Sequence, residues 1–465
     1  MRLTLRRPDY FGKSTSKCQG KGDCSMGDVL RDTGGAKSKR IPKFEGLRGV
    51  LALGVVVYHV AFQAGVGSFV GEPGKPFWGV LADGLGVCLP PFFALSGMML
   101  YKPYARVTIS GTKRPATGRF LKRRALRILP AYYLLLVFAI PGYNWFEIDS
   151  VSDVLRPVLL MHFYLPEGQP MHGIEPTWTV PAEFTFYLVL PLIAWIGHRL
   201  ARGGSTPAQK ARRLLLPLAA LEVMAICWVT YTNLPSTGAT MQWYWPPYYA
   251  GCFAAGMALA IYSAYAEAAP GTPGFYRFVI RRPLICWVPL IPLYLLYATK
   301  PIGIPGMGDN AALAQELVDH FILTSFTLLL LAPMTVPGAE SRFSDALFTS
   351  KPILFLGQIS LGVYLWHEIV INLWLRNGSI FGKSPVPTPE FRGDMGFWEL
   401  FLFTISISVV LATISFYLVE KPLIRFGERG GPPRGNLPPA PAEPALRIPD
   451  QRRPDSSPEP TAERT

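Results

Sequence analysis

The sequence predicts an all-α polytopic membrane protein with about ten transmembrane helices and with both termini in the cytoplasm. Half of the 465 residues are hydrophobic and only 16% are charged, against about 25% in typical soluble domains. Apolar runs long enough to cross a bilayer as helices recur along the chain. The weakly alternating segments of a transmembrane β-barrel are absent from the sequence. We therefore expect a multi-pass protein of the cell membrane.

The predicted spans alternate in direction because basic residues gather in every second connection. The apolar runs lie at 44–63, 79–101, 125–141, 177–197, 213–231, 245–264, 283–298, 315–336, 352–375 and 397–419. Lys and Arg are dense in the connections at 102–127, 199–213 and 277–282 and after the last span, and sparse in the others. Because cytoplasmic loops carry the excess of Lys and Arg, this alternation places both termini in the cytoplasm.

One apolar segment, 154–165, is too short to span and lies within a connection on the outer side. We interpret it as re-entrant or interfacial, because a further span here would turn every later basic loop outward.

Two polar tails flank the membrane domain, which covers 41–428. Residues 1–40 are basic and rich in Gly, Ser and Lys, and they lack the apolar core of a secretory signal. Residues 429–465 are rich in Pro and charged residues. Both compositions are typical of disordered segments, which we expect on the cytoplasmic side.

The formal net charge of +14 and the pI near 9.5 do not indicate a nucleic-acid partner. The basic residues fall in short loops between apolar runs, and no nucleic-acid-binding motif accompanies them. The six cysteines show no metal-ligand spacing, so the sequence predicts no metal site.

The stretch FEGLRGVLALGVVVYHVA at 44–61 is an apolar helix candidate with few ionisable groups. Arg48 and His59 are eleven residues apart, or about three turns plus 20°, so both lie on one helix face. At a rise of about 1.5 Å per residue they are roughly 16 Å apart along the axis. Because such groups are costly in lipid, we expect this face to meet the protein interior or a wet cavity that suits an elongated ligand.

Arg124 and Arg127 lie at i and i+3 in FLKRRALRILPAYY, and so share a face at the cytoplasmic mouth of the third span. Paired guanidinium groups are well suited to phosphate oxygens. An ordinary cluster of positive-inside residues explains the same pattern, because Lys122 and Arg123 extend the basic run.

Three further polar groups lie within apolar runs. Glu183 lies about two turns into the fourth span, and His367 lies in the middle of the ninth. For each of them the sequence is compatible with a structural hydrogen bond and with a functional role. Ser96 precedes Gly97 in FFALSG, a small pair that permits close helix approach. Without a G-x-S-x-G pattern, Ser96 is not expected to be a nucleophile.

Six motifs in order resemble membrane acyltransferase family 3, the integral membrane O-acyltransferases that modify surface sugars and some secondary metabolites. They are FEGLRGVLALGVVVYHV with Arg-x10-His, FFALSG, RALRILPAYY with Arg-x-x-Arg, WTVPAEFTFYLVLPL, SLGVYLWHEIV and VEKPLIRF. The motifs extend over 40–425. Each motif alone is weak evidence for the family, whereas all six in this order are specific. The chain departs from the family pattern at GVCLPPFF (86–93), where the family commonly has Gly-Val-Asp-Leu before its paired Phe. The nearest aspartate, Asp83, lies upstream of the family's position.

The resemblance implies an acyl-CoA donor held by Arg124, Arg127 and Arg48 on the cytoplasmic side, with the thioester near His59. It implies transfer of an acetyl or other short acyl group to a hydroxyl of a carbohydrate, glycolipid or macrolide. The protein would be surrounded by membrane lipid, and neither nucleic acid nor metal would take part. Some relatives carry an appended esterase-like domain. Here a Pro-rich segment follows the last span, so we expect transfer to the acceptor within the membrane part or on a separate protein.

Under this resemblance His59 acts as general base on the acceptor hydroxyl, which we favour, or attacks the thioester directly to give an acyl-imidazole. Glu183 would orient the acceptor or the imidazole. The competing classes are a multi-span transporter or flippase and a non-catalytic scaffold. No inverted repeat supports a transporter, and a scaffold leaves the buried Arg48 and His59 unexplained.

Overall fold

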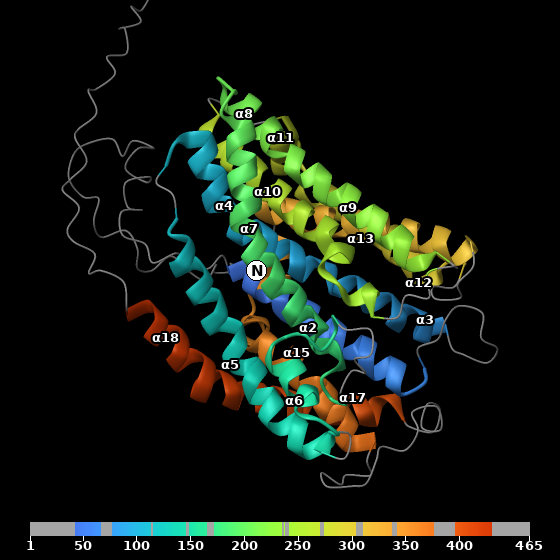
Figure 1. Cartoon of the computed structure of the whole chain (residues 1–465). Helices are drawn as coiled ribbons and strands as arrows, with labels where there is room; N and C mark the ends of the chain where they lie inside the picture. The colour runs from blue at the N-terminus through green and yellow to red at the C-terminus, as the bar shows by residue number, and fades with distance from the viewer. Residues whose placement is uncertain are drawn as a thin grey trace, which may run out of the picture.

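The chain forms a bundle of long apolar helices (Figure 1). The computed structural model describes residues 42–66, 77–112, 115–145, 148–164, 172–234, 237, 241–269, 274–303, 310–336, 342–375 and 396–429. Within these ranges there is no strand, and nine helices are long and apolar enough to cross a membrane, or ten if one bent pair counts as a span. This confirms the predicted all-α polytopic fold. The predicted tails lie outside the described residues, apart from Arg429.

The helices fall into long spanning segments and short connecting elements. The long segments are α2 (Pro42–Gln63), α3 (Phe77–Gly84) with α4 (Pro90–Ser110), α5 (Thr117–Tyr143), α7 (Thr179–Ala201), α9 (Leu216–Asn233), α10 (Ala250–Ala268), α11 (Gly274–Arg281) with α12 (Leu290–Thr299), α13 (Asn310–Thr335), α15 (Lys351–Leu375) and α17 (Phe397–Ser415). The short helices are α6 (Val151–Val158), α8 (Pro207–Leu214), α14 (Arg342–Phe348) and α18 (Lys421–Arg429). Single turns are η1 (Leu85–Cys88), η3 (Glu175–Trp178), η4 (Gln242–Tyr244), η5 (Pro246–Tyr249), η6 (Pro283–Trp287) and the π turn η7 (Phe416–Glu420).

Helix α2 lies inside the bundle and is the element around which the site is built. No residue between positions 43 and 63 is exposed. Its neighbours are α15, α17, α14 and η1, and Figure 1 shows α2 in blue crossing the middle of the molecule. The apolar run predicted at 44–63 is therefore a central helix, and its polar side chains face protein.

The contact between α2 and α15 depends on glycine at the crossing point. A Cβ atom on Gly357 would lie 1.9 Å from the carbonyl oxygen of Glu45, and one on Gly49 would lie 2.7 Å from the carbonyl oxygen of Ile353. Both contacts are with backbone, so a side chain at either position would separate the helices. A second close approach joins α4 to α10, where a Cβ on Gly256 would lie 1.9 Å from the Ala94 carbonyl oxygen.

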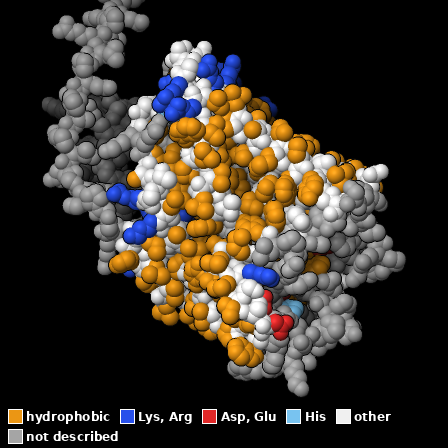
Figure 2. Space-filling view, viewed as in Figure 1, with side chains coloured by type: hydrophobic (Ala, Val, Ile, Leu, Met, Phe, Trp, Pro, Cys, Tyr) orange, Lys and Arg blue, Asp and Glu red, His pale blue; other side chains and the backbone are white. Residues whose placement is uncertain are grey.

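The outward face of the bundle is apolar over a broad band, with Lys and Arg gathered at one end (Figure 2). The large exposed hydrophobic side chains of the described residues include Val137, Phe138, Leu188, Leu192, Val223 and Ile291. The basic end carries the C-terminus of α7 and helix α8 in Figures 1 and 2. This distribution suits a protein surrounded by hydrocarbon and bounded on one side by a basic surface.

Two predicted spans are broken by proline. The run at 79–101 consists of α3, the turn η1 and α4, and Pro90 and Pro91 are the first residues of α4, where their missing N–H groups cost nothing. The run at 283–298 consists of η6 and α12, and it bends by 96° from α11. Pro283 and Pro289 cannot donate backbone hydrogen bonds, which explains the break.

The segment predicted as re-entrant or interfacial contains α6, which has eight residues and is too short to span. Tyr132 and Tyr133 of α5 donate hydrogen bonds to the carbonyl oxygens of Pro157 and Val158 at 2.7 Å and 3.2 Å. These bonds fasten the short helix against α5.

We predict that Gly357→Ala destabilises the protein, because the added methyl group would meet the Glu45 carbonyl oxygen. Overpacking of this kind costs about 1–3 kcal/mol. The melting temperature of the purified protein in detergent should fall, whereas Gly118→Ala, which meets nothing within 4 Å, should leave it unchanged. Equal melting temperatures for the two variants would contradict the close helix crossing.

Candidate functional site

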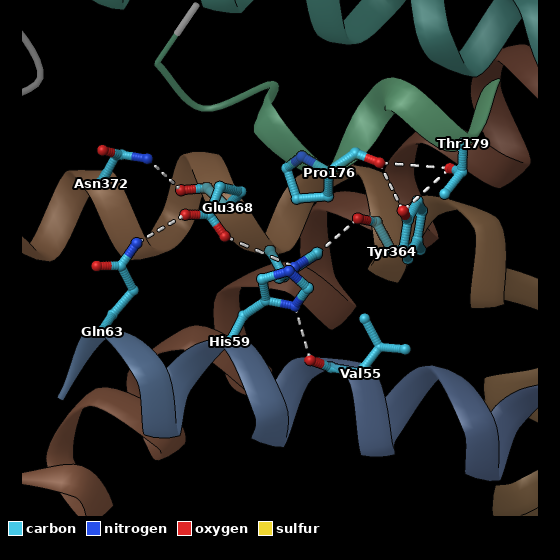
Figure 3. A network of polar contacts seen from close by, with 9 residues as sticks. Val55, His59, Gln63, Pro176, Thr179, Tyr364, Glu368 and Asn372 are labelled. Atoms are coloured by element: carbon cyan, nitrogen blue, oxygen red, sulfur yellow. Dashed lines mark hydrogen bonds and ion pairs between the residues drawn. The ribbon is translucent and has the colours of Figure 1, made fainter. Parts of the chain in front are cut away.

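A buried polar network joins α2, α15 and the start of α7 (Figure 3). It contains His59 and Gln63 from α2, and Tyr364, His367 and Glu368 from α15. The rings of His59 and His367 lie 4.8 Å apart between their centroids. Polar side chains enclosed in a membrane protein carry a high cost unless they bond to one another, so such a network points to function.

The orientation of His59 is fixed by its own helix. Its Nδ1 lies 2.9 Å from the carbonyl oxygen of Val55, one turn earlier. A carbonyl oxygen only accepts, so Nδ1 carries the proton and the neutral ring keeps a lone pair on Nε2. In Figure 3 the ring turns this second nitrogen away from Val55, toward the side on which Glu368 lies.

His367 is oriented in the same way on α15. Its Nδ1 lies 2.6 Å from the carbonyl oxygen of Tyr364, and its side chain is fully buried. Its Nε2 lies 3.7 Å from Oε2 of Glu368, which is also buried. Gln63 donates to the other oxygen of Glu368 at 3.2 Å.

Tyr364 connects this cluster to the start of α7. Its hydroxyl donates to the carbonyl oxygen of Pro176 at 2.6 Å and accepts from Thr179 at 3.0 Å. Its ring lies 5.8 Å from that of His367. The motifs around 177–191 and 360–370, far apart in the sequence, are therefore packed together beside α2.

A second polar group forms where α7 meets α4. Oε1 of Glu183 accepts hydrogen bonds from the hydroxyl groups of both Ser96 and Tyr187. Ser96 and Tyr187 are both buried. Ser96 is thus a hydrogen-bond donor to Glu183, and the structural hydrogen bond considered for Glu183 is observed.

The predicted phosphate-binding arginines lie on the side of α5 that is turned toward the protein. Arg124 and Arg127 are half-buried, whereas Lys122 and Arg123 are exposed. Arg124 lies within electrostatic range of Tyr187, and Arg127 within that of Glu420. The helical period thus divides the basic run into an inward pair and an exposed pair.

Arg48 and His59 both face protein, but they meet different helices. Nη2 of Arg48 lies 3.6 Å from Sδ of Met99 on α4, whereas His59 faces α15. The stripe predicted from their spacing is therefore enclosed along its length. Glu183 bonds to Ser96 and Tyr187, and His59 bonds to the Val55 carbonyl. Tyr364 lies within electrostatic range of both Glu183 and Glu368.

Sequence reasoning singled out His59, His367, Ser96 and Glu183 but missed the residues that connect them. Gln63 lies one turn after His59 on α2, a spacing that was available from the sequence. Tyr187 and Tyr364 lie within the motifs WTVPAEFTFYLVLPL and SLGVYLWHEIV, but they were not singled out because tyrosine is common in apolar helices.

Aromatic rings lie next to the cluster on the side opposite to the basic end. Trp178 is 5.4 Å from Tyr244 and 4.6 Å from Tyr249, and Tyr249 is 5.2 Å from Phe93, all between ring centroids. Tyr244 lies within electrostatic range of Tyr58, the neighbour of His59. Burial, and secondarily the charge of Glu175, raises the pKa of Tyr244, so its phenol stays protonated and able to donate.

Residues 41–420 match the protein family described as "Acyltransferase domain". The chain belongs to this acyltransferase family. The match includes every residue of the two polar groups and all three arginines, so these side chains lie within the acyltransferase domain.

Several relatives are similar to this acyltransferase. The peptidoglycan O-acetyltransferase OatA of Listeria monocytogenes is 20% identical over 406 residues, which cover 84% of this chain and 56% of that protein. The putative peptidoglycan O-acetyltransferase YrhL of Bacillus subtilis is 22% identical with the same coverage. The putative acetyltransferase ORF330 of Acidianus two-tailed virus is 24% identical, over 75% of this chain and 89% of its own length. No solved structure matches the chain.

The acyltransferase spans only slightly more than half the length of the two bacterial relatives. The family match covers 41–420, and the described residues of the chain contain nine or ten candidate spans. The chain is therefore an integral membrane acyltransferase family member, as its motifs indicated.

We predict that Glu183→Leu lowers the melting temperature of the acyltransferase more than Glu183→Gln does. Leucine leaves two buried hydroxyl donors without an acceptor, each costing about 1–3 kcal/mol, whereas the glutamine carbonyl can accept in place of the carboxylate. Thermal unfolding of the purified variants measures the difference. Equal melting temperatures would show that the Ser96 and Tyr187 bonds do not stabilise the protein.

Proposed function

We propose that the chain is an integral membrane O-acyltransferase that transfers an acetyl or other short acyl group from acyl-CoA to a hydroxyl of a cell-envelope carbohydrate or related glycolipid. His59 is the general base. The family supplies the reaction class, and the names of the bacterial relatives supply a carbohydrate polymer as the acceptor class.

The observation that carries the proposal is the state of His59. Its Nδ1 proton is held by the Val55 carbonyl at 2.9 Å, so the ring is fixed in the tautomer whose Nε2 can accept a proton. A general base needs this combination of fixed orientation and free lone pair. A transporter requires no such feature, and family membership favours the acyltransferase class over the transporter alternative.

The arginines suit the donor. Arg124 and Arg127 lie in the first part of α5, and Arg48 lies in the first part of α2. We propose that this end faces the cytoplasm, and that the guanidinium groups bind the phosphates of acyl-CoA through paired charge-assisted hydrogen bonds. The distance of roughly 16 Å from Arg48 to His59 along α2 leaves room for the extended pantetheine arm.

The chemistry follows from these positions. Nε2 of His59 takes the proton of the acceptor hydroxyl as its oxygen attacks the thioester carbonyl carbon. The carbon–sulfur bond then breaks, and the imidazolium returns the proton to the departing thiolate, which gives free CoA and the O-acyl product. Glu183, whose Oε1 already accepts two hydrogen bonds, is a positioning group.

The aromatic rings at the opposite end suit a carbohydrate acceptor. Trp178, Tyr244 and Tyr249 combine apolar faces with polar edges close to the His59 end of α2. Binding sites of small molecules are typically lined by such rings with few polar groups. An acceptor on this side would reach His59 from the face away from the donor phosphates.

We predict that His59→Ala lowers acyl transfer by a factor on the order of 10²–10⁴, the usual contribution of a general base. Purified protein in detergent is incubated with radiolabelled acetyl-CoA and envelope glycans, and incorporation is counted. His172→Ala, a matched histidine substitution on the half-exposed outer connection, should retain full activity. Normal turnover by folded His59→Ala would end the proposed mechanism.

Arg127→Ala should raise the KM for acyl-CoA roughly tenfold or more, because a hydrogen bond to a charged group is worth about 1.5–3 kcal/mol. The kcat at saturating donor should change much less. Arg123→Ala removes the same charge from an exposed neighbouring position and should leave the KM near the wild-type value. If both substitutions weaken donor binding equally, the arginines act only through general charge.

A further inference from the structure

Ligand atoms of His59, His367 and Glu368 lie close together. One ring nitrogen of each histidine and one carboxylate oxygen all lie within 4.8 Å of one another. Nε2 of His367 and Oε2 of Glu368 have no hydrogen-bond partner among the residues that the structure describes. His367 is 0% exposed and Glu368 is 2% exposed, so bulk water does not compensate them.

Among the described residues, neither imidazole directs its proton toward these atoms. The protons of both imidazoles are directed to backbone carbonyls, at Val55 and Tyr364, so the neutral rings offer only lone pairs to the cluster. The distance of 3.7 Å between Nε2 of His367 and Oε2 of Glu368 is too long for a hydrogen bond. Three electron-rich atoms that face one another in a buried place are stabilised by a cation or a proton held among them.

The arrangement matches the way in which proteins bind transition metals. A histidine ligand usually donates its other ring N–H to a backbone carbonyl or carboxylate, as both rings do here. Two imidazoles and one carboxylate form a common ligand set for zinc, with bond lengths of about 2.0–2.2 Å. Tetrahedral ligands at such distances lie about 3.4 Å apart, which is close to the observed 3.7 Å.

We propose that His59, His367 and Glu368 form a binding site for a divalent transition-metal ion, with zinc as the best match. Two nitrogen ligands exclude calcium and magnesium, which prefer oxygen. Gln63 supports the site by bonding the second oxygen of Glu368 at 3.2 Å. The three ligand atoms, which lie within 4.8 Å of one another, would draw closer around a bound ion.

The effect on catalysis rests on the proposed function. The Nε2 lone pair of His59 that would take the proton of the acceptor is the same lone pair that would bind the ion. A bound ion therefore blocks the general base, and zinc inhibits acyl transfer. The site makes the enzyme responsive to zinc.

The test is a titration of the full-length, chelator-stripped protein in detergent with Co²⁺, followed by its visible ligand-field absorption and by displacement with Zn²⁺. We expect one Co²⁺ per chain. Glu368→Gln and His367→Gln should each weaken binding at least tenfold. His320→Gln is the matched control, because His320 forms another buried pair with a carboxylate, 2.9 Å from Glu222, and it should bind Co²⁺ normally.

Absence of Co²⁺ binding by the folded wild-type protein would overturn the proposal, as would unchanged binding by both cluster variants. If neither of these variants folds, Gln63→Ala, at the end of α2, tests the same site and should weaken binding roughly tenfold. Metal binding without any acyl transfer would refute the proposed function and support the site. Stimulation of transfer by zinc would support the site and refute His59 as general base.

Discussion

The close packing of α2 against α15 is the constraint on which the rest of the site depends. Glycines at positions 49 and 357 let the two backbones approach to a distance that any side chain would prevent. The same pair of helices brings His59 and His367 together further along, with ring centroids 4.8 Å apart. Two small residues near one end of the bundle thus set the geometry of polar side chains near the other.

Burial in a membrane protein makes each polar group depend on a partner. Glu183 is matched by Ser96 and Tyr187, His320 by Glu222, and Lys300 by Asp319. Among these buried groups the His59 cluster differs, because its ring protons point to backbone and its remaining atoms face one another. That unbalanced arrangement suits a site that accepts a proton or binds a cation.

The two arginines of α5 show how tertiary structure separates residues that look alike in sequence. Lys122, Arg123, Arg124 and Arg127 form one basic run. Helical geometry turns Arg124 and Arg127 inward, toward Tyr187 and Glu420, and leaves the other two exposed. A basic side chain that marks topology and one that can bind a ligand therefore differ only in the direction in which the side chain points.

The sequence by itself determined the fold class, the inward face of the first long helix and the membership of an acyltransferase family, because these follow from apolar length, helical period and ordered motifs. It also identified His59, His367 and Glu183 as polar groups within apolar runs, where burial is costly without a bonding partner or a function. Only the tertiary structure decided that His59 meets His367 and Glu368, that Glu183 bonds to Ser96, and that proline breaks two of the expected spans. Contacts between helices far apart in the chain depend on how the helices pack, and the hydrophobic periodicity of a single sequence does not show which helices are neighbours.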